Sequence, residues 1–318
     1  MTQQNRLTIN DIARLSGVGK STVSRVLNNE GNVSPQTRER VLQVIEQQHF
    51  SPSKSARAMR GFSDKIVAII VSRLDSPSEN LAVRAMLPLF YQQGYDPIVL
   101  ESQFSAERVK EHLQVLKQRN IDGIVLFGFT GLSAQMLTPW QDKMVVLARD
   151  MPGLSSVCYD DAGAVQLLMQ KLLAQNIREI GFIGVSPQDT TTGQRRSAAF
   201  RTFCKEHGLT PHIALGELTY QSGFDLIPLL LKNNIQAVVC ASDTIAIGAQ
   251  KYLQQQQIRG VQVCGIGNNP LLHFLFPESY SVELGYGAGG EAAAKQLLAQ
   301  LSGSTTVRQL IIPGKLAL

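Results

Sequence analysis

The chain has 318 residues, a formal net charge of +5 and a hydrophobic content of 44%. Its N-terminus is polar and lacks the apolar segment of a secretory signal, and no apolar run approaches the roughly 20 residues needed to cross a bilayer. A secreted protein and a membrane-spanning protein are thereby excluded. We expect a cytoplasmic protein with no membrane partner.

The positive charge is concentrated at one end of the chain. Residues 1–60 contain nine Lys and Arg against four Asp and Glu, whereas residues 61–318 contain 21 of each kind. A basic terminus on a neutral body is typical of a nucleic-acid-binding module attached to another domain. On charge alone, the alternative is a solvated basic face without a function.

The motif TINDIARLSGVGKSTVSRVLN, which begins at Thr8, predicts two short helices joined by a glycine turn. Thr8 and Asp11 have the spacing of a capping box, and Gly17 supplies the turn. The first helix is expected to point Ile12 and Leu15 inward. This pattern indicates a DNA-reading helix-turn-helix.

The second of these helices is expected to bury Val23, Val26 and Leu27 and to expose small polar and basic side chains. Such side chains suit base edges and phosphates in the major groove. They are Lys20, Ser21, Thr22, Ser24 and Arg25. The segment GVGKST also resembles a phosphate-binding loop. However, Arg14 stands where that loop needs its first glycine, and no buried strand precedes it.

A third helix is predicted after Ser34-Pro35, through Val41, Leu42 and Ile45, and it completes a helical head over residues 1–50.

Ser51-Pro52 begins a further short segment, residues 51–62, which is rich in Ser, Ala and Arg. One interpretation is a plain linker, because an isolated helix of this length is marginal in water. The other is a hinge helix that folds only against DNA. In that case its basic side chains contact phosphates, and Met59 inserts between base steps of the minor groove. The basic side chains are Lys54, Arg57 and Arg60.

The body, residues 63–318, alternates apolar runs with amphipathic stretches. The runs KIVAIIVS, DPIVLES, IDGIVLFG, KMVVLAR, EIGFIGV, QAVVCAS and VQVCGIG predict buried strands. Helices are predicted over 79–91, 106–119, 162–175, 193–207, 243–256 and 287–301. This order defines an α/β body, and its length favours two doubly wound sub-domains. Ligands of such sheets bind at the carboxyl ends of the strands, so a cleft between the sub-domains is the expected small-molecule site.

No catalytic constellation, metal site or cofactor motif is recognisable. The cysteines lie in or beside apolar runs without the spacing of metal ligands, which favours buried thiols. They are Cys158, Cys204, Cys240 and Cys264. We therefore expect no catalytic residue, no metal ligand and no cofactor.

Arginines and an aspartate stand where the predicted strands end. Arg73 ends the first strand, Arg149 ends the fourth, Arg195 and Arg196 open the helix after the fifth, and Asp243 follows QAVVCAS. One arginine and one aspartate suffice for a neutral sugar, so four arginines favour an additional phosphate, which guanidinium groups bind bidentately. For any single arginine, a surface or ion-paired position is the alternative.

The head and hinge resemble the lactose repressor/galactose repressor (LacI/GalR) family. The resemblance rests on T-I-x-D-I-A-x-x-x-G-V-x-x-x-T-V-S-R-V-L-N followed by S-P-x-x-x-A-R-x-M. It implies a DNA-binding transcriptional repressor with two lobes of periplasmic-binding-protein type. The chain would cross between the lobes near 159–160, at 281–286 and close to the C-terminus.

The same resemblance implies roles for single residues. Lys20, Ser21 and Arg25 match base-reading positions. Apart from the resemblance, we expect Thr22, Ser24, Asn28 and Arg57 to be further DNA contacts. Met59 stands at the position of an intercalating leucine and is of similar volume. Gly19 replaces the usual Ser or Thr cap, which costs only a few tenths of a kcal/mol. Arg196 and Asp243 match the general sugar-contacting residues.

A closer resemblance, in NRLTI, SARAMRG, DSPSENLAV, QGYDPI and FGFTGL, is to a member of the family that is induced by trehalose 6-phosphate. Arg73, Arg149 and Arg195 belong to this resemblance and not to the family in general. It implies trehalose 6-phosphate as the inducer, free trehalose as a weaker ligand, and control of trehalose uptake and utilisation genes.

The implied mechanism is that of a homodimer on a pseudo-palindromic double-stranded operator, released when the effector alters the lobes and unfolds the hinges. No leucine heptads follow VRQLIIPGK, which favours a dimer over a tetramer. Two alternatives stay open: a sugar- or sugar-phosphate-binding protein, and an enzyme acting on the same ligand.

Overall fold

The computed structural model describes residues 7–27, 31–48, 50 and 65–317. The chain divides into two compact units, Met1–Asp64 and Lys65–Leu318. The predicted hinge over 51–62, with Arg57 and Met59, lies outside the described residues, and so does Asn28.

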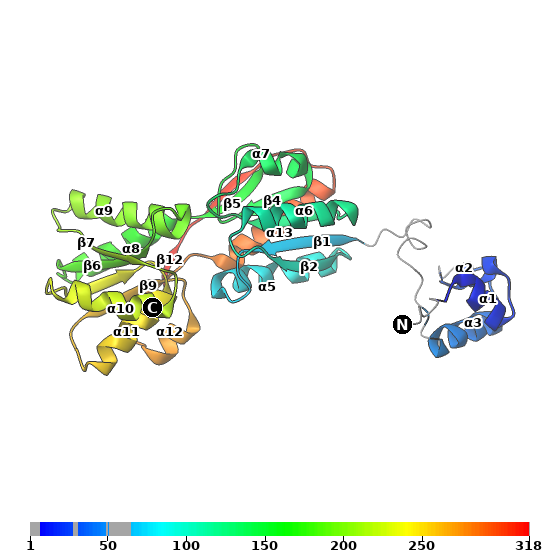
Figure 1. The fold of residues 1–318 in the computed structure, drawn as a ribbon, viewed down its shortest axis with the longest axis horizontal. Coiled ribbons are helices and arrows are strands. Elements are labelled where there is room, and N and C mark those ends of the chain that lie inside the picture. The colour runs from blue at the N-terminus through cyan, green and yellow to red at the C-terminus, as the bar shows by residue number, and fades with distance from the viewer. Residues whose placement is uncertain (1–6, 28–30, 49, 51–64, 318) are drawn as a thin grey trace. The chain divides into compact units, whose positions relative to one another are not determined.

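The first unit contains the three predicted helices, α1 (Ile9–Ser16), α2 (Lys20–Leu27) and α3 (Pro35–Gln47) (Figure 1). The capping box is confirmed: the Thr8 amide donates to Asp11 Oδ2 at 2.8 Å, and the Asp11 amide donates to Thr8 Oγ1 at 3.4 Å. Gly17 ends α1 with φ of 64°, a left-handed conformation that glycine adopts without strain.

A small apolar core joins the three helices. Ile12, Val23 and Val41 are fully buried at its centre. The prediction for Leu15 is wrong, because this side chain is 46% exposed. The buried stripe of α1 instead ends on Ser16, whose hydroxyl donates to the Ile12 carbonyl at 2.6 Å.

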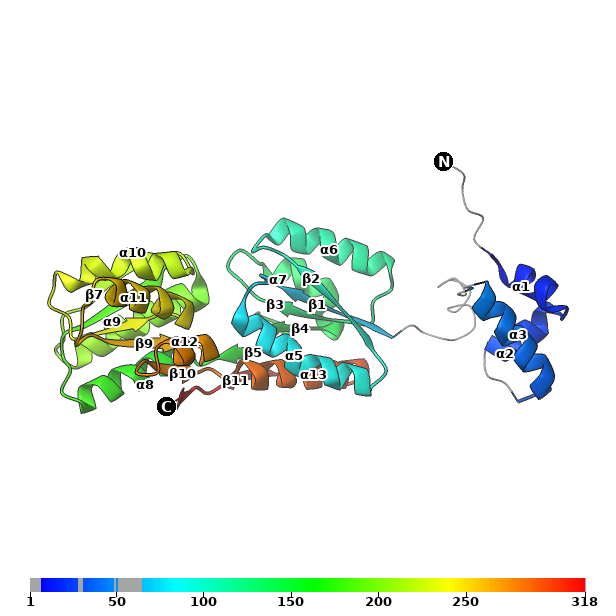
Figure 2. The same ribbon diagram turned by 90° about the horizontal axis from the view of Figure 1, so that it is seen from below.

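The second unit has two lobes, each built on a six-stranded sheet. The first sheet is parallel throughout, in the order β11-β5-β4-β3-β1-β2. Helices α5 (Pro77–Gln92) and α13 (Tyr286–Leu301) cover one of its faces, and α6 (Ala106–Gln118) covers the other (Figure 2). Its strands are β1 (Ile66–Val71), β2 (Asp96–Glu101), β3 (Gly123–Phe127), β4 (Met144–Leu147), β5 (Ser155–Tyr159) and β11 (Gln309–Ile312).

The second sheet has the order β12-β10-β9-β8-β6-β7, and only β12 runs antiparallel to its neighbour. Helices α8 (Asp161–Ala174) and α9 (Arg196–Glu206) cover one face, and α10 (Tyr220–Leu231) and α11 (Asp243–Gln255) cover the other (Figure 1). Its strands are β6 (Ile180–Val185), β7 (His212–Gly216), β8 (Ala237–Cys240), β9 (Gln262–Ile266), β10 (Tyr280–Glu283) and β12 (Lys315–Ala317).

Four short elements connect these parts. Two lie in the first lobe, α7 (Ala134–Leu137) and the 3₁₀ turn η1 (Thr138–Lys143). The others lie in the second lobe, the π-helical turn η2 (Thr190–Arg195) and α12 (Pro270–Leu275).

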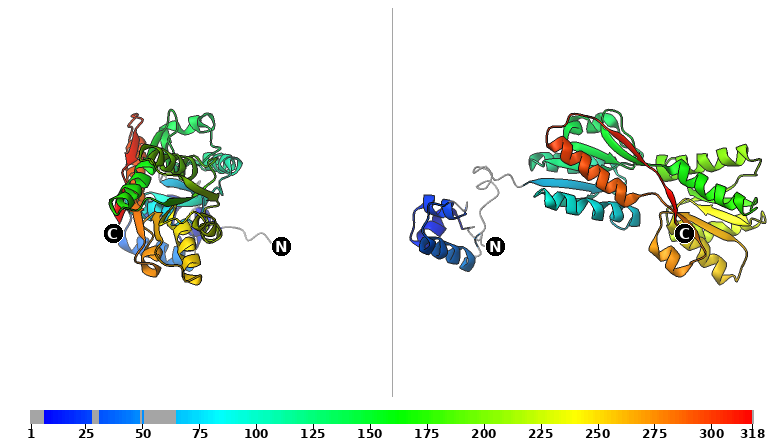
Figure 3. Two further views of the ribbon diagram at one scale, coloured as in Figure 1. Left: turned by 90° about the vertical axis from the view of Figure 1, so that its left-hand side faces the viewer. Right: turned by 180° about the vertical axis from the view of Figure 1, so that it is seen from behind.

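The chain passes between the lobes three times. It leaves the first sheet after β5, returns after β10 to form α13 and β11, and leaves again to form β12. The C-terminal crossing is the red segment in the right-hand view of Figure 3. The first and third crossings are tied together, because the Asp160 amide donates to the Ile312 carbonyl at 3.0 Å.

The expected fold class, a helical head with an α/β body of two doubly wound lobes, is confirmed. The four cysteines are buried free thiols, also as expected. In the described part of the chain, no helix is long and apolar enough to cross a membrane. The sequence reading missed five strands, β5, β7, β10, β11 and β12, and the helices α7, α10 and α12. These strands have at most five residues, β7 is mostly half-buried and β11 is largely exposed, so none forms a long apolar run.

Candidate functional site

Helix α2 presents a polar, basic face on the head. Lys20, Ser21 and Arg25 are exposed, while Thr22 and Ser24 are half-buried. The opposite side of α2 faces the core of the head. An α-helix with this face fits the width of the major groove, where such side chains reach base edges and phosphates.

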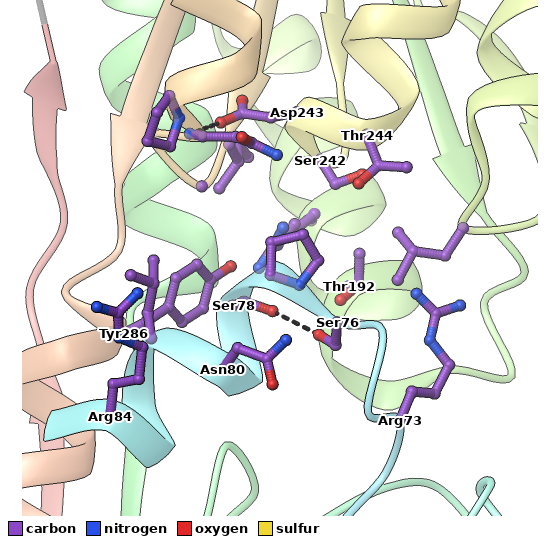
Figure 4. A pocket seen from close by; sticks show the side chains of 18 residues that line it. Arg73, Ser76, Ser78, Asn80, Arg84, Thr192, Ser242, Asp243, Thr244 and Tyr286 are labelled. Atoms are coloured by element: carbon purple, nitrogen blue, oxygen red, sulfur yellow. Dashed lines mark hydrogen bonds between the residues drawn. The ribbon is translucent and has the colours of Figure 1, made fainter. Parts of the chain in front are cut away.

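A cleft lies between the two lobes, where the carboxyl ends of both sheets face each other. It holds one cavity of about 220 Å³ and a smaller one of about 100 Å³ that shares part of its lining. Figure 4 shows the larger cavity, with Ser76 and Asn80 from the start of α5 on one side and Asp243 and Thr244 from the start of α11 on the other.

Arg73 follows β1 and lines both cavities. Its Nε lies 3.1 Å from Asp75 Oδ1, and because the Asp75 side chain is 80% exposed, this ion pair is screened by water and contributes little to stability. Glu79, in the first turn of α5, holds the loop in place by accepting the amide of Ser72 at 2.7 Å and that of Arg73 at 3.4 Å. Burial raises the pKa of Glu79 to about 7, although these amides favour its charged form.

Arg196 and Asp161 form a buried ion pair beside the cleft. Arg196 Nε donates to Asp161 Oδ1 at 2.8 Å, its Nη2 lies 2.7 Å from the same oxygen, and its Nη1 donates to the Ala241 carbonyl. Burial alone would lower the pKa of Arg196, but the Asp161 carboxylate outweighs it and raises the pKa above the ordinary value. The guanidinium therefore stays charged at the floor of the cleft.

Asp243 is buried at the start of α11 and is one of the residues that line the larger cavity (Figure 4). Its carboxylate accepts the Ser281 hydroxyl at 2.8 Å and the Asn269 amide at 2.5 Å. A Cβ on Gly265 would lie 2.1 Å from Asp243 Oδ1, so only glycine lets the carboxylate lie against β9. Burial raises the pKa of Asp243 to about 6. This carboxylate suits the hydroxyl groups of a neutral ligand.

Arg149 and Arg195 line neither of the two cavities. Arg149 Nη1 donates to the Phe129 carbonyl at 2.6 Å and to the Leu132 carbonyl at 3.3 Å. Arg195, on the second lobe, pairs with Asp150 on the first, and this bond lowers the pKa of Asp150. Each guanidinium retains further N–H groups, because Arg carries five donors.

Sequence reasoning missed several residues of the cleft, among them Arg84, Thr192 and Tyr286. Figure 4 places Arg84 and Arg73 on opposite sides of the larger cavity. Arg84 lies inside the amphipathic helix α5, where its position carries no sign of a binding role. Thr192 lies in the π-helical turn η2, and such turns are frequent at functional sites.

The cleft is equipped for binding. Cationic groups at Arg73, Arg84 and Arg196 suit an anionic ligand group, and Asp243 suits hydroxyls. Within the described residues, no group of His, Cys, Asp and Glu side chains could hold a metal ion. A cleft between two lobes, lined by charged side chains, together with a helix-turn-helix head defines the class as a ligand-responsive DNA-binding regulator.

Comparisons with known proteins agree with this class. Residues 8–53 match the family model "Bacterial regulatory proteins, lacI family", and residues 169–317 match "Periplasmic binding protein-like domain". The HTH-type transcriptional regulator TreR of Escherichia coli is 58% identical over 314 residues, which cover 99% of this chain and 100% of the relative. The TreR of Salmonella typhimurium is 57% identical with the same coverage. The chain therefore belongs to the lacI family of bacterial regulatory proteins, and it is a DNA-binding transcriptional regulator.

Solved structures give the same fold. The trehalose repressor from Escherichia coli superposes with a TM-score of 0.79 at 53% identity and covers 80% of this chain and 100% of its own. The lac repressor dimer bound to operator reaches a TM-score of 0.82 at 20% identity, over 99% of this chain and 98% of that one. The second likeness supports the fold alone.

Proposed function

We propose that this regulator represses trehalose uptake and utilisation genes and leaves its operator when trehalose 6-phosphate binds in the cleft. The observation that carries the proposal is the full-length likeness to TreR, at 58% identity. It is supported by the trehalose repressor structure, which is similar over 80% of this chain. Free trehalose is proposed as a weaker ligand of the same cleft.

The phosphate is proposed to bind beside Arg73, at the start of α5. The amino end of a helix carries a partial positive charge and free amide groups, so it attracts phosphate. Arg149 and Arg195 are proposed as further phosphate contacts through the N–H groups that their present partners leave unused. Arg196 and Asp243 are proposed to hold the sugar hydroxyls.

The DNA half of the proposal uses the exposed face of α2. Lys20, Ser21, Thr22, Ser24, Arg25 and Asn28 read and anchor one half-site of a pseudo-palindromic operator, and a homodimer places two heads on it. Residues 51–62 form the proposed hinge, with Arg57 on phosphates and Met59 in the minor groove. A protein with this role works in the cytoplasm, where the operator is.

Repression and induction are then linked equilibria. A ligand that binds better to the lobe arrangement with unfolded hinges lowers operator affinity, and operator DNA lowers ligand affinity by the same factor. The loss of operator affinity depends on how much better the ligand binds one lobe arrangement than the other, and not on how tightly it binds overall.

A direct test is to select binding sites from a random-sequence DNA pool and to titrate the complex with sugars while fluorescence anisotropy reports release. We expect trehalose 6-phosphate to release the DNA at lower concentration than trehalose, with glucose 6-phosphate and maltose as controls. Release by a control sugar and not by trehalose 6-phosphate would contradict the proposed effector. Conversion of the ligand without release would indicate an enzyme.

A further inference from the structure

Phe104 is an exposed aromatic side chain of the cleft that the site described above does not use. It lies in the loop between β2 and α6, lines the smaller cavity and is 47% exposed. The other aromatic side chains that the structure places around the two cavities are more covered: Phe127, Phe129 and Tyr159 are buried and Tyr286 is half-buried. A large apolar ring left open to water inside a polar cleft favours contact with a ligand.

The backbone at Phe104 has an uncommon conformation. Gln103 and Phe104 have φ of 53° and 56°, in the left-handed region that residues other than glycine seldom adopt. Such residues cost free energy and persist only where the surrounding structure holds them, which is frequent at ligand sites. Here the Gln103 amide donates to the Ser72 carbonyl at 2.9 Å, and the Gln103 side chain accepts a 2.6 Å bond from Arg108 Nη1.

These bonds also fix the Phe104 loop to the loop that carries Arg73. Glu101, at the end of β2, accepts the amide of Leu74 at 2.8 Å, so residues on both sides of Arg73 are anchored to this segment. Arg73 and Phe104 line the same cavity of about 100 Å³. Because this cavity is small, a ligand group that occupies it contacts the exposed part of the Phe104 ring.

One neighbouring ring sets the tilt of Phe104. Phe129 meets it edge to face, with ring centroids 5.7 Å apart and planes at 88°. Phe129 is itself buried against the core of the first lobe, so it is a fixed support. About half of the Phe104 side chain stays uncovered on this support.

The chemistry of an aromatic face indicates which ligand group it takes. The face carries a partial negative charge, so it disfavours a phosphate and attracts C–H groups with a partial positive charge. A pyranose ring presents C–H groups on its faces and hydroxyls around its rim. The charged side chains of the same cavity, Arg73, Glu79 and Arg196, suit the rim.

We propose that Phe104 is a specificity-determining residue whose ring packs against the C–H face of a pyranose ring of the bound sugar. This inference rests on the proposed function, in which the cleft takes a sugar ligand.

The test is Phe104→Leu, which keeps an apolar side chain without a branch at Cβ and removes the flat ring. By calorimetry we expect trehalose 6-phosphate and trehalose both to bind about twofold to tenfold more weakly, as for the loss of one aromatic contact. Phe104→Tyr keeps the ring and should bind both ligands like the wild type.

Phe224→Leu is the matched control. Phe224 meets Tyr252 edge to face at 5.3 Å and 80°, but it lines neither cavity. This variant should lower the unfolding temperature and leave both affinities unchanged. A comparable loss of affinity in Phe224→Leu would show that destabilisation alone weakens binding, which would overturn the proposal.

Three further outcomes bear on the inference. Unchanged affinity in Phe104→Leu would overturn it alone, and so would equal losses in Phe104→Leu and Phe104→Tyr, because the ring face would then not matter. A loss confined to trehalose 6-phosphate would overturn the assignment to a pyranose face, which both ligands share. Failure of the wild type to bind either ligand would overturn the proposed function, and this inference with it.

Discussion

Asp161 and Arg196 face each other at the starts of α8 and α9, with side chains only 3% and 5% exposed. The same guanidinium donates to the carbonyl of Ala241, directly after β8. One buried cation thus joins the starts of two helices and the end of a strand in the second lobe. Removing either partner is expected to lower the stability of the fold strongly, because the other would remain as an uncompensated buried charge.

Asp161→Ala should therefore lower the free energy of unfolding by about 3–5 kcal/mol, measured by urea denaturation. Glu291→Ala is the control, since its pair with Lys295 is exposed and should contribute about 1 kcal/mol or less. Similar losses in the two variants would contradict this account of the buried pair.

Arg25→Ala should weaken binding to the selected operator by about 1–3 kcal/mol per half-site and affect random DNA much less, because the lost contact is to a base edge. Anisotropy titrations on both DNAs measure the ratio of the affinity for the operator to the affinity for random DNA. Arg40→Ala, an exposed arginine on α3, should leave that ratio unchanged. Equal losses on both DNAs with Arg25→Ala would remove its base-reading role.

Arg73→Ala should weaken trehalose 6-phosphate binding by about 2–5 kcal/mol and trehalose binding far less, since a desolvated phosphate loses its partner. The same selectivity is expected for Arg149→Ala and Arg195→Ala. Asp243→Ala should weaken both ligands, because they share the sugar hydroxyls. Calorimetry decides: if no arginine variant distinguishes the ligands, the cleft is a neutral-sugar site.

Glu79 makes stability depend on pH. Its pKa is about 7 in the folded protein against 4.5 for the free side chain, so between these values the folded state holds a proton that the unfolded state releases. Stability from this group is therefore fully present below about pH 4.5 and is lost as the pH rises through 7. Glu79→Gln should flatten this fall, on the order of 1–3 kcal/mol, in denaturation curves from pH 5 to 8. An unchanged slope would show that Glu79 is not its source.

Gly290 lets α13 pack closely on α5. A Cβ there would lie 2.2 Å from the Ala82 carbonyl oxygen, so Gly290→Ala should destabilise the protein by about 1–3 kcal/mol. Gly287→Ala, in the same helix, would meet only the Ala85 Cβ at 4.0 Å and should be neutral or stabilising, since alanine favours a helix. Thermal unfolding of both variants is the measurement, and equal shifts would refute the close-approach argument.

Sequence reasoning succeeded where the cause is local. The Thr8 capping box, the Gly17 turn and the long buried strands depend on neighbouring residues, and the structure has them. It could not find Arg84, because the side of α5 that faces the cleft depends on how the lobes pack. Nor could it pair Asp161 with Arg196, since only the folded second lobe brings these two helix starts together. The carbonyl partners of Arg149 could not be predicted either, because only the folded chain brings them next to this side chain.

The three crossings also set an order on assembly during synthesis. The helices α1 to α3 are synthesised first and pack around their own small core. The first lobe is incomplete until α13 and β11 have been synthesised, and the second until β12 has. Neither sheet is complete until the last few residues have emerged. A message that stops after the head but before Tyr286 therefore encodes the three head helices without a complete sheet in either lobe. Such a fragment would keep the helix-turn-helix head and lack the cleft between the lobes.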